Sequence, residues 1–250
     1  MSTCIEQKNK EAVSFIAEED YLEVVVAGHV DHGKSTVVGR LLADAGVLPE
    51  GKIERIRDQC ERNARPFEYA FLLDALKDEQ AQGITIDTAR CFFKTEKRHY
   101  VIRDAPGHIE FLKNMVTGAA SAEAALLVID AREGIRENSR RHGYLLSLLG
   151  LRQLAVVVNK MDLVGYDEMA FRSIEKEFGT FLSRLGIAET VFIPVCAQQG
   201  GNLVRRAPET PWYAGNTVLE QLDAFRKPVG DVAKPFRLPV QDIYKFTEQG

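Results

Sequence analysis

The sequence predicts an α/β three-layer domain built on a mostly parallel sheet. Short apolar runs alternate with longer helical patterns along the chain, as in folds that pack helices on both faces of a sheet. Two of the runs, "AALLVID" and "LAVVVNK", are continuously apolar, which is typical of parallel strands covered on both faces. In such folds ligands bind at the carboxyl ends of the strands, so the functional residues are expected there.

The predicted elements follow from these patterns in chain order. The strands are expected at 22–27, 89–94, 99–103, 125–130, 154–159 and 191–195. The helices are expected at 34–44, 52–63, 67–79, 109–120, 137–149, 167–184 and 216–226.

Composition excludes several classes of protein. The chain has 250 residues, of which 45% are hydrophobic and 27% charged, and its net charge of −4 argues against a general binder of nucleic acid or anionic membranes. The cysteines Cys4, Cys60, Cys91 and Cys196 are scattered without a C-x-x-C pair, so reduced thiols are expected, with Cys91 and Cys196 in the core. No apolar run approaches the ~18 residues of a membrane span. These features predict a cytoplasmic protein.

A phosphate loop is predicted by the stretch "AGHVDHGKST", residues 27–36. It fits the pattern G-x-x-x-x-G-K-S/T, in which backbone N–H groups cradle phosphates at the start of a helix. Lys34 would reach the outer phosphates, and the Ser35 hydroxyl would bind magnesium. A chance match in an ordinary turn occurs in roughly one chain in a hundred of this length, but the β-rich run before it and the helical run after it favour the loop. The expected nucleotide contacts here are Gly28, His29, Val30, Asp31, His32, Gly33, Lys34, Ser35 and Thr36.

Two further stretches carry residues suited to the metal and the γ-phosphate. In "VIRDAPGH", 101–108, Asp104 can hold magnesium through water, the N–H of Gly107 can turn towards a γ-phosphate, and His108 can contact an attacking water. In "DEQAQGITID", 78–87, Thr85 offers a second hydroxyl to the metal.

The base is expected between two later strand ends. In "VNKMD" Asn159 and Asp162 suit guanine, because an aspartate accepts both N–H groups on its edge and adenine has no such pair. In "VCAQ" the N–H of Ala197 can meet the base carbonyl. The expected base contacts are Asn159, Lys160, Asp162, Cys196, Ala197 and Gln198.

Each of these residues alone has a simpler interpretation, such as a helix cap, a turn or a surface histidine. Their order at successive strand ends predicts a GTPase that binds GTP or GDP with Mg²⁺. A P-loop kinase or ATPase fails on "NKMD", which has no reason to be present for adenine.

The stretches "GHVDHGKS", "GITID", "DAPGH" and "NKMD" resemble the motifs of the translational GTPase superfamily, in the order of that family. The resemblance implies that Val30 and Ile84 form an apolar gate beside a catalytic histidine, His108. The implied catalytic groups are His108, Lys34, Thr85 and Gly107. The family's fifth motif is usually Ser-Ala-Leu, whereas this chain has Cys-Ala-Gln at 196–198.

Two branches of that superfamily fit the chain. The stretches "FFKTEKRHYVI" and "RRHGYLLSLLG" are similar to the GTPase subunit of bacterial ATP sulfurylase, which implies GTP hydrolysis coupled to sulfate adenylation with a sulfate adenylyltransferase partner subunit. "GHVDHGKS" and "KPFRLPVQDIYKF" instead resemble elongation factors, which deliver aminoacyl-tRNA to the ribosome. The sulfurylase similarity covers more residues and is the preferred hypothesis, with the elongation factor as the alternative.

The domain boundaries follow from composition. Residues 1–20 form a polar N-terminal extension, 21–226 the GTP-binding domain, and 227–235 a proline-containing linker. Residues 236–250 alternate like the first strand of a β-barrel domain, and such a strand needs partners. We therefore expect the chain to be the N-terminal part of a longer protein.

Overall fold

The computed structural model describes residues 21–73, 90–104, 122–187 and 189–227. Its strands are β1 (Tyr21–Gly28), β2 (Arg90–Lys94), β3 (His99–Asp104), β4 (Ala124–Asp130), β5 (Leu154–Asn159) and β6 (Thr190–Pro194). Its helices are α2 (Lys34–Asp44), α3 (Lys52–Arg62), α6 (Glu137–Leu148), the 3-10 helix η2 (Met161–Val164), α7 (Glu168–Arg184) and α8 (Val218–Ala224).

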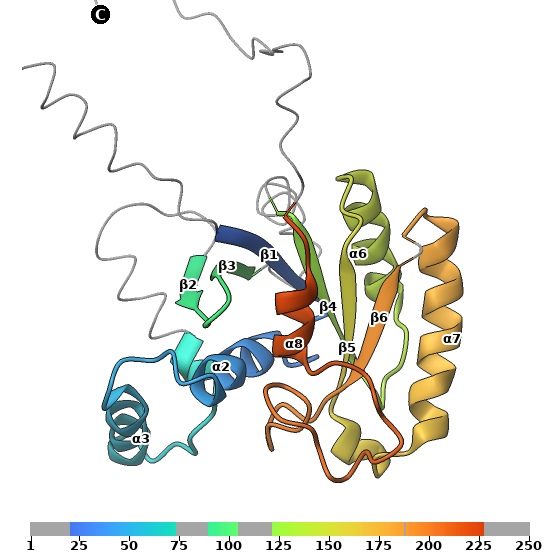
Figure 1. The fold of residues 1–250 in the computed structure, drawn as a ribbon. Coiled ribbons are helices and arrows are strands. Elements are labelled where there is room, and N and C mark those ends of the chain that lie inside the picture. Colours follow the sequence, from blue (N-terminus) through green and yellow to red (C-terminus); the bar gives the residue numbers. More distant parts are fainter. Residues whose placement is uncertain (1–20, 74–89, 105–121, 188, 228–250) are drawn as a thin grey trace, which may run out of the picture.

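The strands form one sheet in the order β2-β3-β1-β4-β5-β6 (Figure 1). β2 and β3 pair in antiparallel fashion, and the other neighbours are parallel. The predicted α/β fold with a mostly parallel sheet is confirmed. The register brings the carboxyl ends of the parallel strands to one edge, where Asp130 stands opposite Asn159 and Val26 opposite Asp104.

Helices cover both faces of the sheet because alternate strand residues point to opposite sides. α2 and α8 contribute Val38 and Leu222 to one apolar core, together with Val26 of β1. α6 and α7 pack on the other face, where Leu146 and Phe178 join a second core. Every residue of β4 and β5 is buried, as the continuously apolar runs predicted.

Side-chain caps explain where two of the helices begin. α8 is shorter than the predicted 216–226, because Thr217 caps it in a reciprocal capping box with Glu220 and Phe225 is already extended. α7 begins at Glu168 because the Asp167 side chain accepts hydrogen bonds from the first-turn N–H groups. The 3-10 helix over 161–164 was not predicted.

Several predictions fall on residues outside the described part of the chain. They include the helix at 109–120, the extension over 1–20 and the β-barrel strand over 236–250. The helix predicted at 67–79 is visible only from residue 70 to residue 73, where the described range ends. The domain boundaries therefore stay predictions.

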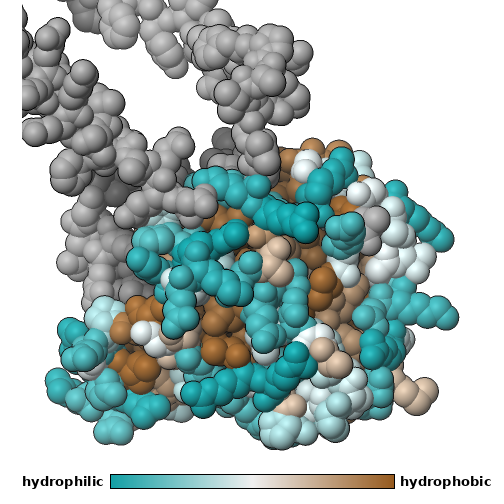
Figure 2. Space-filling view, viewed as in Figure 1, coloured by the Kyte–Doolittle hydropathy of each residue, from teal (hydrophilic) through white to brown (hydrophobic). Residues whose placement is uncertain are grey.

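The surface of the described residues is mostly hydrophilic on the face in Figure 2, with smaller apolar patches near α2 and α3. Among these residues no helix has the length and apolar character needed to cross a membrane. Cys60, Cys91 and Cys196 lie in buried positions, which agrees with the expectation that Cys91 and Cys196 belong to the core.

Candidate functional site

The predicted phosphate loop connects β1 directly to α2, and its glycines are required by its shape. Gly28 has a φ of 148° and Gly33 a φ of 85°, values that side chains rarely adopt. A Cβ on Gly28 would lie 2.5 Å from the carbonyl oxygen of Val128, and one on Gly33 would lie 2.5 Å from Nδ2 of Asn159. The loop thus packs tightly against the ends of β4 and β5.

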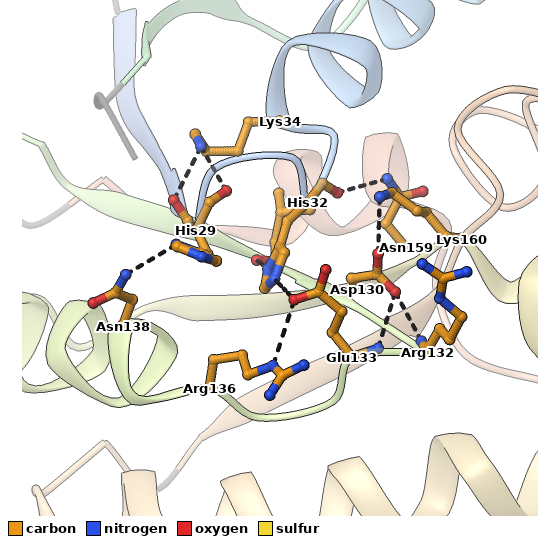
Figure 3. Close-up of polar contacts among 12 residues, drawn as sticks. His29, His32, Lys34, Asp130, Arg132, Glu133, Arg136, Asn138, Asn159 and Lys160 are labelled. Atoms are coloured by element: carbon orange, nitrogen blue, oxygen red, sulfur yellow. Dashed lines mark hydrogen bonds and ion pairs between the residues drawn. The ribbon is translucent and has the colours of Figure 1, made fainter. Parts of the chain in front are cut away.

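Lys34 lies at the start of α2 and folds back over the loop. Its Nζ donates to the carbonyl oxygens of Gly28 at 3.0 Å and His29 at 2.9 Å (Figure 3). The side chain is largely buried, with 9% exposed. Such a held ammonium group at the mouth of a glycine-rich loop suits a multiply charged anion. Ser35 and Thr36 follow in the first turn of α2 and are half-buried.

Asn159 joins the phosphate loop to the segment after β6. Its Nδ2 donates to the carbonyl oxygen of His32 at 2.9 Å, and its Oδ1 accepts the N–H of Ala197 at 3.0 Å. Asn159 is only 2% exposed, so both bonds are shielded from water. The N–H of Ala197, which is expected to meet the base carbonyl, thus donates to the Asn159 side chain in this structure.

Asp162 lies on the 3-10 helix, where Cys196 supports it. The thiol donates to Oδ1 of Asp162 at 3.1 Å. Burial raises the pKa of Cys196, and the hydrogen bond to Asp162 raises it further, so the sulfur stays protonated and can donate. Cys196 stands where the resembling motif has a serine, and a thiol is a weaker hydrogen-bond donor than a hydroxyl. The backbone turn that follows brings Gln198 and Gln199 beside α2, where Arg40 donates to their carbonyl oxygens.

Asp130 is a part of the site that the sequence did not single out. It ends β4, is fully buried, and its Oδ1 accepts the N–H groups of Arg132 and Glu133. Its Oδ2 pairs with Nζ of Lys160 at 2.8 Å (Figure 3). Burial alone would raise the pKa of Asp130, but the bonds from Lys160, Glu133 and Arg132 hold it below its ordinary value.

The pair between Asp130 and Lys160 supports an unusual backbone conformation at Lys160. Lys160 has a φ of 61°, a left-handed conformation that is unfavourable for a lysine. The buried carboxylate stabilises that conformation and sets the direction of the side chain. The sequence signal that could have identified Asp130 is an acidic residue at the end of a buried strand, in "VIDAREG".

The two histidines of the phosphate loop, His29 and His32, have different surroundings. His32 is fully buried, and its ring bonds the carbonyl oxygen of Val128 at 3.2 Å while its other nitrogen lies 3.6 Å from Glu133. Burial lowers the pKa of His32, so the ring is neutral. His29 accepts a hydrogen bond at 2.9 Å from Nδ2 of Asn138 on α6. The His32 side chain therefore packs between the loop and the end of β4. A contact of this residue with nucleotide would use its backbone.

Other predicted site residues lie only partly within the described chain. Thr85, Gly107 and His108 are outside it. Asp104 ends β3 beside β1, which puts its backbone at the same edge of the sheet as the phosphate loop. No group of three or more histidine, cysteine or acidic side chains forms a metal site among the described residues. The predicted magnesium ligands, the Ser35 hydroxyl and the carboxylate of Asp104, are oxygen donors of the kind Mg²⁺ prefers.

The fold and these loops together define a GTP-binding domain of the P-loop type, and comparison with known proteins gives the family. Residues 19–228 match the family model described as the elongation factor Tu GTP binding domain. The chain therefore belongs to this family.

Individual relatives and solved structures agree with that assignment. Elongation factor 1-alpha of Methanosphaerula palustris is 43% identical over 236 residues, which cover 93% of this chain and 55% of the relative. Sup35 complexed with GMPPNP is 28% identical with a TM-score of 0.57, over 87% of this chain and 48% of that one. The S. cerevisiae Ski7 GTPase-like domain bound to GTP has a TM-score of 0.70 at 22% identity, over 85% of this chain and 51% of that one, and shows the fold alone. The chain spans about half the length of the curated relatives it matches.

These relatives change the order of the two functional hypotheses. The sequence motifs alone favoured the GTPase subunit of ATP sulfurylase. The similar proteins are named elongation factor 1-alpha, which supports the elongation-factor alternative better than the sulfate pathway.

Proposed function

We propose that this chain is the GTP-binding and GTP-hydrolysing domain of an elongation-factor-like protein that delivers aminoacyl-tRNA to the ribosome in the cytoplasm. The similarity to elongation factor 1-alpha over 93% of the chain supports this proposal. The chain spans about half the length of those relatives. Binding of tRNA and the ribosome, which is an activity of a whole elongation factor, is therefore part of the proposal.

The observation that carries guanine recognition is the linkage of the loops by Asn159. It ties the phosphate loop, through His32, to the turn that bears Ala197. Asp162 stands beside that turn, held by Cys196. A carboxylate in this position accepts the two N–H groups of a guanine edge, and no adenine edge offers that pair.

The phosphates are proposed to bind in the loop over 28–34. Lys34 would exchange its bonds to the carbonyl oxygens of Gly28 and His29 for the β- and γ-phosphates. Ser35, Thr85 and Asp104 would hold Mg²⁺, which neutralises the charge that develops on the phosphates. The protein then contributes mainly by positioning, as in other phosphoryl transfers.

Hydrolysis is proposed to depend on a water held by His108, with the N–H of Gly107 on the γ-phosphate. The apolar side chains of Val30 and Ile84 would restrict access of that histidine until a partner binds. Val30 lies half-buried in the phosphate loop, and the other three residues lie outside the described chain.

The experiment that tests the proposal measures aminoacyl-tRNA binding by the full-length protein with GTP, GDP or a non-hydrolysable analogue. Tight binding only with GTP or its analogue is the expected result. Binding that ignores the nucleotide contradicts the proposal. The sulfurylase hypothesis predicts instead a GTP-dependent complex with an adenylyltransferase subunit, and GTP-stimulated formation of adenylyl sulfate from ATP and sulfate would support it.

A further inference from the structure

Arg40 of α2 makes a set of contacts with the turn that follows β6, over residues 196–201. Its Nη1 donates to the carbonyl oxygen of Gln198 at 2.7 Å, and its Nη2 to that of Gln199 at 3.1 Å. Its Nε donates to both carboxylate oxygens of Asp44, each at 2.8 Å. The guanidinium group thus binds two successive backbone carbonyls of the turn and one carboxylate of its own helix.

The guanidinium group is held in place on its other sides as well. It lies over the ring of Tyr69, 4.5 Å from the ring centre, a cation–π contact that fixes its plane. Gly39 allows this approach, because a Cβ there would lie 1.9 Å from the carbonyl oxygen of Tyr69. Gly200 leaves room on the side of the turn, since its Cβ would lie 2.6 Å from Nη2 of Arg40. Arg40 is therefore pre-organised for the turn and has 17% of its side chain exposed.

The hydrogen bonds inside the turn leave two carbonyl oxygens available to such a donor. The N–H groups of Gln199, Gly200 and Gly201 all point inward to the carbonyl oxygen of Cys196. The carbonyl oxygens of Gln198 and Gln199 are left free of these turn hydrogen bonds, and both accept from the Arg40 side chain of another element. A fork of N–H donors such as arginine fits two adjacent carbonyls, whereas an ammonium group is a single point of charge.

We propose that Arg40 is a positioning residue for guanine recognition, which holds the turn over 196–201 in the shape that meets the base and so sets how long a guanine nucleotide stays bound. The proposal rests on the guanine-nucleotide binding argued above. α2 begins at the phosphate-binding Lys34, and Arg40 on the same helix fastens the turn that bears Ala197. One rigid helix therefore sets the distance between the phosphate and base halves of the site.

The expected effect of Arg40→Ala is a faster release of GDP by about 10- to 100-fold, since two charge-assisted hydrogen bonds to the turn are lost. Arg40→Lys should give an intermediate rate, because an ammonium group does not serve both carbonyls in one geometry. Arg140→Ala is the matched control. Arg140 pairs with Glu177 at 2.6 Å and lies over the ring of Phe181 at 5.3 Å, but on α6 and away from the turn.

The decisive test compares nucleotides in equilibrium titrations of the full chain. GDP and IDP keep the 6-oxo group that the turn is expected to meet, and the diphosphate of 2-aminopurine riboside lacks it. Arg40→Ala should weaken GDP and IDP by similar factors and the 2-aminopurine nucleotide by at least about threefold less, because that nucleotide gains little from an ordered turn.

An equal loss for all three nucleotides would overturn the inference, since it would make Arg40 a general support of the fold. Unchanged GDP binding in Arg40→Ala would overturn it as well. If the wild-type chain bound no GDP, the proposed function would be wrong, and the inference that rests on it would be refuted as well. Normal wild-type binding with an Arg40 variant that behaves like Arg140→Ala would refute the inference alone.

Discussion

Asn159→Ala removes the side chain that connects the two halves of the nucleotide site. The substitution deletes a 2.9 Å bond to the carbonyl oxygen of His32 and a 3.0 Å bond from the N–H of Ala197. The residue is 2% exposed, so water replaces these partners poorly. Two lost bonds cost at least about 1 kcal/mol, and about 2 to 6 kcal/mol if both partners stay buried and unpaired.

This free energy divides between folding and binding. Where the loops relax in the free protein, the nucleotide must order them again, so part of the cost appears as lost affinity. We expect Asn159→Ala to lower the free energy of unfolding and to weaken GDP binding at least about tenfold, which is about 1.4 kcal/mol. Denaturant unfolding without nucleotide and calorimetric titration with GDP measure the two parts separately.

The control is Ser147→Ala, which removes a 2.7 Å bond to the carbonyl oxygen of Leu185 between α6 and α7. It should lower stability by about 1 kcal/mol and leave GDP affinity of the folded protein unchanged. The reasoning is refuted if Asn159→Ala binds GDP within about twofold of the wild type, or if Ser147→Ala weakens GDP equally.

Four further outcomes are expected. Asp162→Asn should exchange GTP for XTP in competition binding, because the amide can donate to the extra carbonyl of xanthine; a variant that still prefers GTP by about tenfold would contradict the base pocket. Cys196→Ser should tighten GDP binding by roughly three- to tenfold in titrations, since a hydroxyl donates to Asp162 more strongly than a thiol, and looser binding would argue against that contact. His108→Ala should keep nucleotide affinity and slow GTP hydrolysis by about 10²–10⁴-fold in single-turnover assays; equal losses in both would make the residue structural. Burial lowers the pKa of His142 to about 4 in the folded protein, so the unfolded chain binds the extra proton between its ordinary pKa and that value. Stability should therefore fall as the pH drops through this window, by at most about 1.4 kcal/mol per unit for this group, and His142→Gln should flatten the slope in urea unfolding at several pH values.

The sequence by itself determined the class of fold and the position of the main loops. Apolar runs with a strand period and amphipathic runs with a helix period are local patterns, and they gave β4, β5 and α2 within a residue or two. Gly28 and Gly33 were expected to let the backbone turn tightly and approach an anion without a Cβ, and in the structure both have a positive φ. The site residues near 159 and 196 were predicted from their place after strands, since parallel strands end at one edge.

The tertiary structure alone decided how those pieces contact one another. The order of the strands places Asn159 against the carbonyl oxygen of His32, buries the His32 ring under the loop, and brings Asp130 to Lys160. No local period encodes such pairs, because they join residues far apart in the chain whose distance depends on sheet order and register. The contact of Arg40 with the turn at 198–199 spans 158 residues of sequence, and only the packing of α2 beside the end of β6 creates it.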